Sequence, residues 1–87
     1  MPRVSAFYGI VIWMYWNEGH HQRPHFHARI GDHAASVAFD GEVLGGNLPR
    51  RALKLVSEWA ALHGDELEAN WNRARTRTLL EPIDPLP

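Results

Sequence analysis

Residues 23–32, RPHFHARIGD, alternate polar and apolar side chains along most of their length. Successive side chains of a β-strand point to opposite faces, so this alternation predicts a strand with one apolar and one polar face. We expect Phe26, Ala28 and Ile30 to face the core. The polar face then presents two imidazoles and a guanidinium, those of His25, His27 and Arg29.

Gly31-Asp32 is a two-residue turn signal with glycine first, which favours a type II′ hairpin. Such a hairpin has a definite register, because a slip of one residue would scatter the apolar side chains over both faces. The predicted pairs are Ile30 with His33, Ala28 with Ala35, and Phe26 with Val37. Opposite the polar set stand small side chains, those of Ala34, Ser36 and Ala38.

The segment 7–16 is rich in β-branched and aromatic residues at both odd and even positions, so both faces of a strand would be apolar. This pattern predicts a central strand covered on two sides. Asp40-Gly41 favours a second tight turn, of the type I′ kind, before a short edge strand over 42–44. Gly45-Gly46 is expected to end that strand. Together these segments predict an antiparallel β-meander of about four strands.

The C-terminal half has the pattern of two helices. Asn47-Leu48-Pro49 predicts the first helix, with Asn47 or Leu48 at the cap and proline in the first turn. We expect Gly64 to end it, and Asp65 with Glu68 resembles the capping box of a second helix. The first helix has a broad apolar arc, formed by Ala52, Leu55, Val56, Trp59, Ala60 and Leu62. The second helix turns Leu67, Trp71 and Ala74 inward.

The predicted fold class is therefore α+β, an antiparallel meander with both helices packed on one face. Eighty-seven residues suffice for one hydrophobic core. We expect a single domain over residues 1–80 and a proline-rich, irregular tail over residues 81–87.

Composition excludes several classes of function. The chain has no cysteine, which removes disulfides, thiolate metal sites and a cysteine nucleophile. Nine Lys and Arg against ten Asp and Glu give a net charge of −1, so no global charge draws the protein to nucleic acid. The longest apolar run is far shorter than the roughly 20 residues of a membrane helix, and the N-terminus is no signal peptide. We expect a cytoplasmic protein without membrane insertion.

The polar strand face suits acid–base chemistry on RNA. In a metal-independent ribonuclease, His25 and His27 would act as acid and base, while Arg29 would hold the phosphate. RNA is the natural substrate, because its 2′-hydroxyl is an internal nucleophile that a base activates. A purely structural role, in which both imidazoles cover the sheet, is an equally open interpretation.

A transition-metal site is an alternative use of the same histidines. Their Cα atoms are expected to lie about 6.5 to 7 Å apart, so both rings can reach one ion. Zinc or another divalent transition metal accepts imidazole. Glu18, His20 or His21 from the preceding loop could complete the site, with His20 as the candidate third ligand. Otherwise no cofactor is expected.

Arg50, Arg51 and Lys54 cluster on the first turns of the predicted helix. A solvated helix face is their default interpretation. They become substrate-binding residues if an RNA backbone crosses that end of the domain. A third hypothesis is a non-enzymatic module that binds a neighbouring protein, with an exposed tryptophan as one possible anchor.

Three stretches resemble a known family of small bacterial proteins: residues 7–12 (FYGIVI), 24–29 (PHFHAR) and 48–53 (LPRRAL), the last leading to Glu58-Trp59. The family is Domain of Unknown Function 4160, and PHFHA is its most specific part. The resemblance implies no established activity. It does imply a genetic arrangement like a toxin–antitoxin pair, with a small cognate partner protein, and this favours a role in a two-protein module that acts on or binds RNA.

Overall fold

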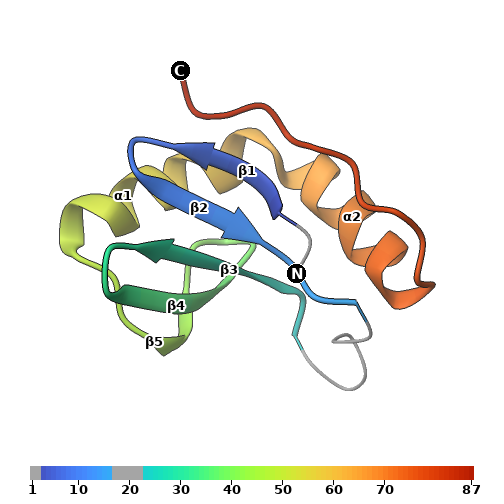
Figure 1. Cartoon of the computed structure of the whole chain (residues 1–87), viewed down its shortest axis with the longest axis horizontal. Coiled ribbons are helices and arrows are strands. Elements are labelled where there is room, and N and C mark those ends of the chain that lie inside the picture. The colour runs from blue at the N-terminus through green and yellow to red at the C-terminus, as the bar shows by residue number, and fades with distance from the viewer. Residues whose placement is uncertain (1–2, 17–22) are drawn as a thin grey trace.

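The computed structural model describes residues 3–16 and 23–87. Over these ranges an antiparallel sheet is followed by two helices, which confirms the predicted α+β meander (Figure 1). The five strands lie in sequence order across the sheet. The elements are β1 (Arg3–Phe7), β2 (Ile10–Trp13), β3 (His25–Ile30), β4 (His33–Ala38), β5 (Val43–Gly46), α1 (Arg50–Leu62) and α2 (Gly64–Arg75).

The central hairpin of β3 and β4 has the predicted register. Phe26 pairs with Val37, Ala28 with Ala35, and Ile30 with His33. Gly31 has a φ of +56°, as the first central residue of a type II′ turn requires. Alternation and turn chemistry together therefore determine this part of the sheet.

The single first strand predicted over 7–16 is wrong, and this is why the sheet has a fifth strand. The chain reverses at Tyr8-Gly9, and Phe7 pairs with Ile10 across the turn. Both turn residues have positive φ, +50° and +81°, as a type I′ turn requires. Tyrosine seldom adopts this left-handed conformation, so the sequence carries only half of the usual turn signal.

The loop from β4 to β5 also differs from the prediction. It has three residues rather than two. The amide of Gly41 donates to the carbonyl of Ala38 (2.9 Å), and the amide of Ala38 donates to the carbonyl of Glu42 (2.8 Å). Gly41 closes the loop with a φ of +95°, the left-handed position of a three-residue hairpin. The expected type I′ turn is therefore wrong.

Gly45 and Gly46 do not end the edge strand, because both pair with β4. Gly45 lies opposite Ser36, and Gly46 lies opposite Ala35 with a φ of +73°. The register shifts between Ser36 and Val37, and this bulge lets glycine stay in the ladder.

Helix α1 lies on the Phe26 face of the sheet. Trp59 contacts both Phe26 and Phe7, with ring centroids 5.5 and 5.6 Å apart. Pro49 occupies the N-cap position without a side-chain cap, which replaces the cap expected at Asn47 or Leu48. Leu62, expected in the apolar arc, is instead 64% exposed.

The junction between the helices explains the exposure of Leu62. Helix α2 begins at Gly64, so this glycine opens a helix rather than ending one. His63 takes the inner side of the junction and packs against Trp59, with centroids 5.7 Å apart. Its Nδ1 lies 2.6 Å from Glu66 Oε1. No side-chain cap forms at the start of α2, so the predicted capping box of Asp65 with Glu68 is wrong. The residues predicted to face inward from α2 are buried as expected: Leu67, Trp71 and Ala74.

The segment 76–87 has no helix or strand, yet it packs along β1 and α2 (Figure 1). The amide of Ile83 donates to the carbonyl of Val4 (2.8 Å), and the side chain of Ile83 is buried. The indole of Trp59 donates to the carbonyl of Asp84 (2.9 Å). These bonds tie the C-terminal segment to the core.

Candidate functional site

The rings of His25 and His27 lie side by side, as the alternation of β3 predicted. Their centroids are 5.2 Å apart and their planes are inclined by 77°. The two imidazoles nevertheless have different surroundings: His25 is only 5% exposed, whereas His27 is half-buried. The pair is therefore not two equivalent solvent-facing groups.

Helix α2 accounts for the burial of His25. This residue opens β3, where the indole of Trp71 packs against the imidazole with centroids 5.2 Å apart. The Nδ1 atom of His25 donates to the carbonyl of Arg23 (2.8 Å), which fixes the orientation of the ring. His25 thus links the start of β3 to α2.

His27 belongs to a cluster of rings on the sheet face opposite α1. Its imidazole stacks on the indole of Trp13, with centroids 5.4 Å apart and an interplanar angle of 20°. The ring of Tyr15 meets His27 edge-on at 4.9 Å, and Ser36 Oγ lies 3.4 Å from Nδ1. We call Trp13, Tyr15 and His27 the aromatic cluster. Tyr15, its outermost member, is 39% exposed.

Arg29 lies two residues beyond His27 on the same face, and it is exposed. Its partners on the adjacent strands are Val11 and Ala34, neither of which carries a charge. No ion pair holds Arg29 within residues 3–16 and 23–87. We call the side of the sheet opposite α1 the open face. It carries a buried Trp13 and a half-buried His27, stacked on each other, next to the exposed Arg29, which has no ion pair among the described residues.

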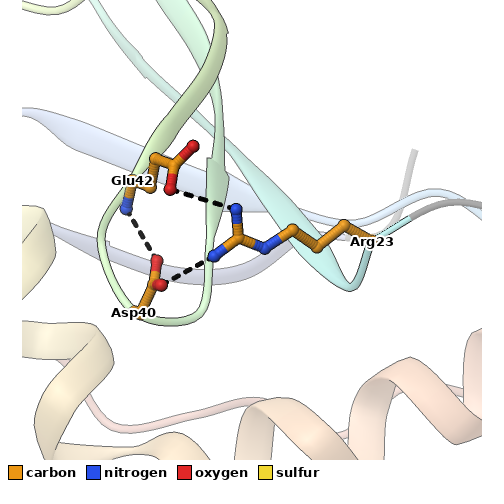
Figure 2. A network of polar contacts seen from close by, with 3 residues as sticks. All are labelled: Arg23, Asp40 and Glu42. Atoms are coloured by element: carbon orange, nitrogen blue, oxygen red, sulfur yellow. Dashed lines mark hydrogen bonds and ion pairs between the residues drawn. The ribbon is translucent and has the colours of Figure 1, made fainter.

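A polar network beside His25 was not predicted from the sequence. Figure 2 shows the guanidinium of Arg23 between two carboxylates, 2.7 Å from Asp40 and 3.1 Å from Glu42. The hydrogen bond that the guanidinium of Arg23 donates to Glu42 raises the pKa of Arg23 above its ordinary value, and the negative charge of Asp40 acts in the same direction. The amide of Glu42 donates to Asp40 (2.9 Å), which completes the network.

This network borders a shallow hollow of about 270 Å³, lined by Arg23, His25, Ser36, Leu44 and Gly45. Sequence reasoning missed it because the partners of Arg23 come from the loop after β4. The only available signal was Pro24, which marks where the chain enters β3.

The three basic residues predicted to bind substrate are not brought to the histidine face. Arg50, Arg51 and Lys54 are exposed on α1, which packs on the opposite side of the sheet. Arg51 shares a groove with Ile30, whose side chain points away from the side of Arg29. The structure thus separates the two predicted parts of an RNA site.

The predicted metal site is only partly described. His20, the proposed third ligand, lies outside the described residues. Among residues 3–16 and 23–87, no group of three or more His, Asp or Glu could hold a metal ion. Metal binding through His25 and His27 stays a prediction.

Strands β2 to β5, helix α1 and most of helix α2 fall within one family match. The chain matches the model of the family described as Domain of unknown function (DUF4160) over residues 9–72, and it belongs to that family. The match spans the aromatic cluster, Arg29 and α1. No curated protein and no solved structure matches the chain. Within the described part of the chain, no helix is long and apolar enough to cross a membrane.

Proposed function

We propose that this protein binds single-stranded RNA across the open face of its sheet, through the aromatic cluster and Arg29. One observation carries the proposal. His27 lies flat on Trp13 with Tyr15 at its edge, and the exposed guanidinium of Arg29 lies on the same side of the sheet, opposite α1.

The chemistry of single-stranded RNA fits this surface. Unpaired bases stack on aromatic rings, including imidazole, and arginine contacts the phosphates between them. The strand partners of His27 and Arg29 on β4 have small side chains, those of Ser36 and Ala34. Because the net charge is −1, we expect an affinity that depends on stacking more than on long-range attraction.

Binding is better supported than cleavage. A general acid or base must reach the atom that it protonates or deprotonates. His25 is buried against Trp71, and its Nδ1 is bonded to a backbone carbonyl. The acid–base roles predicted for His25 and His27 therefore have less support than a stacking role for His27. The two-protein arrangement implied by the family resemblance stays a prediction.

The experiment is a titration of the protein into a fluorescein-labelled oligouridylate, read as fluorescence anisotropy. We expect saturable binding that His27→Ala weakens at least about fivefold, because a base loses its stacking partner. His27→Phe keeps the ring and should keep the affinity. Arg29→Ala should reduce the salt dependence by about 0.7 in the slope of log K against log salt.

The matched control is Arg75→Ala, which removes the same charge from an exposed position on α2. It should bind RNA as the wild type does. Equal affinity of the wild type and the His27→Ala variant would contradict the proposal. If the wild type cleaves the RNA and the His27→Phe variant does not, the result would instead favour His25 and His27 as acid and base.

One observation favours the metal alternative. A histidine that donates Nδ1–H to a carbonyl is oriented to offer Nε2 to a metal, and His25 makes such a bond to Arg23. Calorimetric titration of untagged protein with zinc tests this candidate. Stoichiometric binding that His25→Ala and His27→Ala both abolish would support it, and no binding by the wild type would refute it.

A further inference from the structure

A second surface lies at the other end of β3, on the side of the sheet that carries α1. It is a groove of about 260 Å³, lined by Tyr8, Ile30, Pro49, Arg51, Ala52 and Leu55. All lining residues except Arg51 have apolar or aromatic side chains. The groove lies between the Tyr8-Gly9 turn and the first turns of α1, so it is separate from the aromatic cluster.

Tyr8 forms one edge of this groove in an unusual conformation. Its φ is +50°, yet the side chain is large and 57% exposed. Asparagine or glycine would fit such a turn with less strain. The hydroxyl of Tyr8 donates to the carbonyl of Pro87 (2.6 Å), which holds the ring at the edge of the groove. A strained and exposed aromatic residue at a groove is typical of a site that contacts a ligand.

The opposite edge is strongly positive. Arg50, Arg51 and Lys54 are exposed on the first turns of α1, and none of them forms an ion pair with the described residues. The first turn of α1 contains no acidic residue, so the positive end of the helix dipole adds to these charges. An apolar groove with a positive rim is complementary to a ligand that combines an apolar side chain with carboxylates.

We propose that this groove binds an acidic segment of a partner protein. A bulky apolar side chain of the segment inserts between Tyr8 and Leu55, and an adjacent carboxylate pairs with Arg51. The apolar lining favours a peptide over RNA, whose backbone would place phosphates against Ile30 and Leu55. The proposal does not depend on RNA binding, because it uses a different face of the domain.

The experiment starts from random peptides displayed on phage and selected on the immobilised protein. We expect enriched peptides in which acidic residues flank a large apolar residue. A synthetic, fluorescein-labelled copy of the most enriched peptide is then titrated with the wild type and two variants. Arg51→Glu and Tyr8→Asn should each weaken binding at least about tenfold, which corresponds to 1.4 kcal/mol.

Two features keep this test interpretable. Asn-Gly is a preferred type I′ turn, so Tyr8→Asn removes the ring while preserving the fold. Arg75→Glu makes the same charge reversal as Arg51→Glu at an exposed position of α2, and it should leave peptide binding unchanged.

Three results would overturn the proposal. The first is peptide binding without the predicted specificity, seen either as enrichment of peptides without acidic residues or as binding that both Arg51→Glu and Tyr8→Asn retain. The second is that the phage selection enriches no peptide while Arg51→Glu abolishes oligouridylate binding, which would make the groove an RNA surface. The third is a dimer in sedimentation velocity that Tyr8→Asn dissociates, which would make a second copy of the chain the occupant.

Discussion

The imidazole of His27 lies almost parallel to the indole of Trp13, with centroids 5.4 Å apart and 20° between the planes. The two residues are direct partners in the β2–β3 ladder. Their contact therefore joins two neighbouring strands, and it places the indole of Trp13 against the imidazole.

This cross-strand contact should contribute measurably to stability. We expect His27→Ala to lower the free energy of unfolding by about 1 kcal/mol, because aromatic cross-strand pairs contribute roughly that amount. Urea denaturation followed by tryptophan fluorescence measures the change. His27→Phe preserves a stacked ring and should stay within about 0.5 kcal/mol of the wild type. A loss in both variants would show that an imidazole nitrogen, rather than stacking, stabilises the pair.

The two glycines of β5 should respond very differently to alanine. A Cβ atom at Gly46 would collide with the carbonyl oxygen of Ala34, and its φ of +73° is strained for any other residue. Gly46→Ala should therefore destabilise the protein by about 2 kcal/mol or more. A Cβ atom at Gly45 meets nothing within 4 Å, so Gly45→Ala should change stability by less than about 0.5 kcal/mol. Equal midpoints in thermal unfolding would show that the register of β5 is different.

Asn70 should control the docking of the C-terminal segment. Its fully buried side chain donates to the carbonyl of Glu81 (2.8 Å) and accepts from the amide of Glu81 (3.0 Å). Asn70→Leu leaves both backbone groups without these partners, so we expect a loss of about 2 to 3 kcal/mol. Hydrogen exchange at the backbone amides of Glu81, Ile83 and Asp84 should accelerate in this variant. Asn72→Leu, on the exposed side of α2, is the control, and similar exchange in both variants would contradict the prediction.

Tyr8→Asn should raise stability while it weakens peptide binding. The substitution relieves the left-handed strain of tyrosine but loses the hydrogen bond to Pro87, so we expect a net gain of about 0.5 kcal/mol. Chemical denaturation measures the gain. A net loss would mean that Tyr8 is retained for its bond to the C-terminal segment rather than for a ligand.

The sequence pattern predicted the structure correctly where the periodicity of the apolar side chains was clear. The pairing of β3 with β4 follows from alternation around Gly31-Asp32, and the inward residues of α2 follow from helical periodicity. The split of the first strand could not be predicted in the same way. Its turn contains Tyr8 between two apolar runs, and tyrosine gives no local signal for a positive φ.

At the candidate site, the sequence likewise predicted the local arrangement within β3 but not the contacts made by distant elements. Alternation predicted that the rings of His25 and His27 would lie together, and they do. The burial of His25 depends on Trp71, which comes from a distant helix. The separation of Arg51 from the histidine face depends on which side of the sheet α1 covers. Neither fact is present in the spacing of residues along the chain.

The most direct test of RNA binding on the open face is a nuclear magnetic resonance titration of the labelled protein with oligouridylate. We predict that the signals of Trp13, Tyr15, His27 and Arg29 shift together and saturate, while those of Arg50 and Lys54 on α1 stay in place. Shifts confined to α1, or no shift on the open face at saturating RNA, would contradict the account.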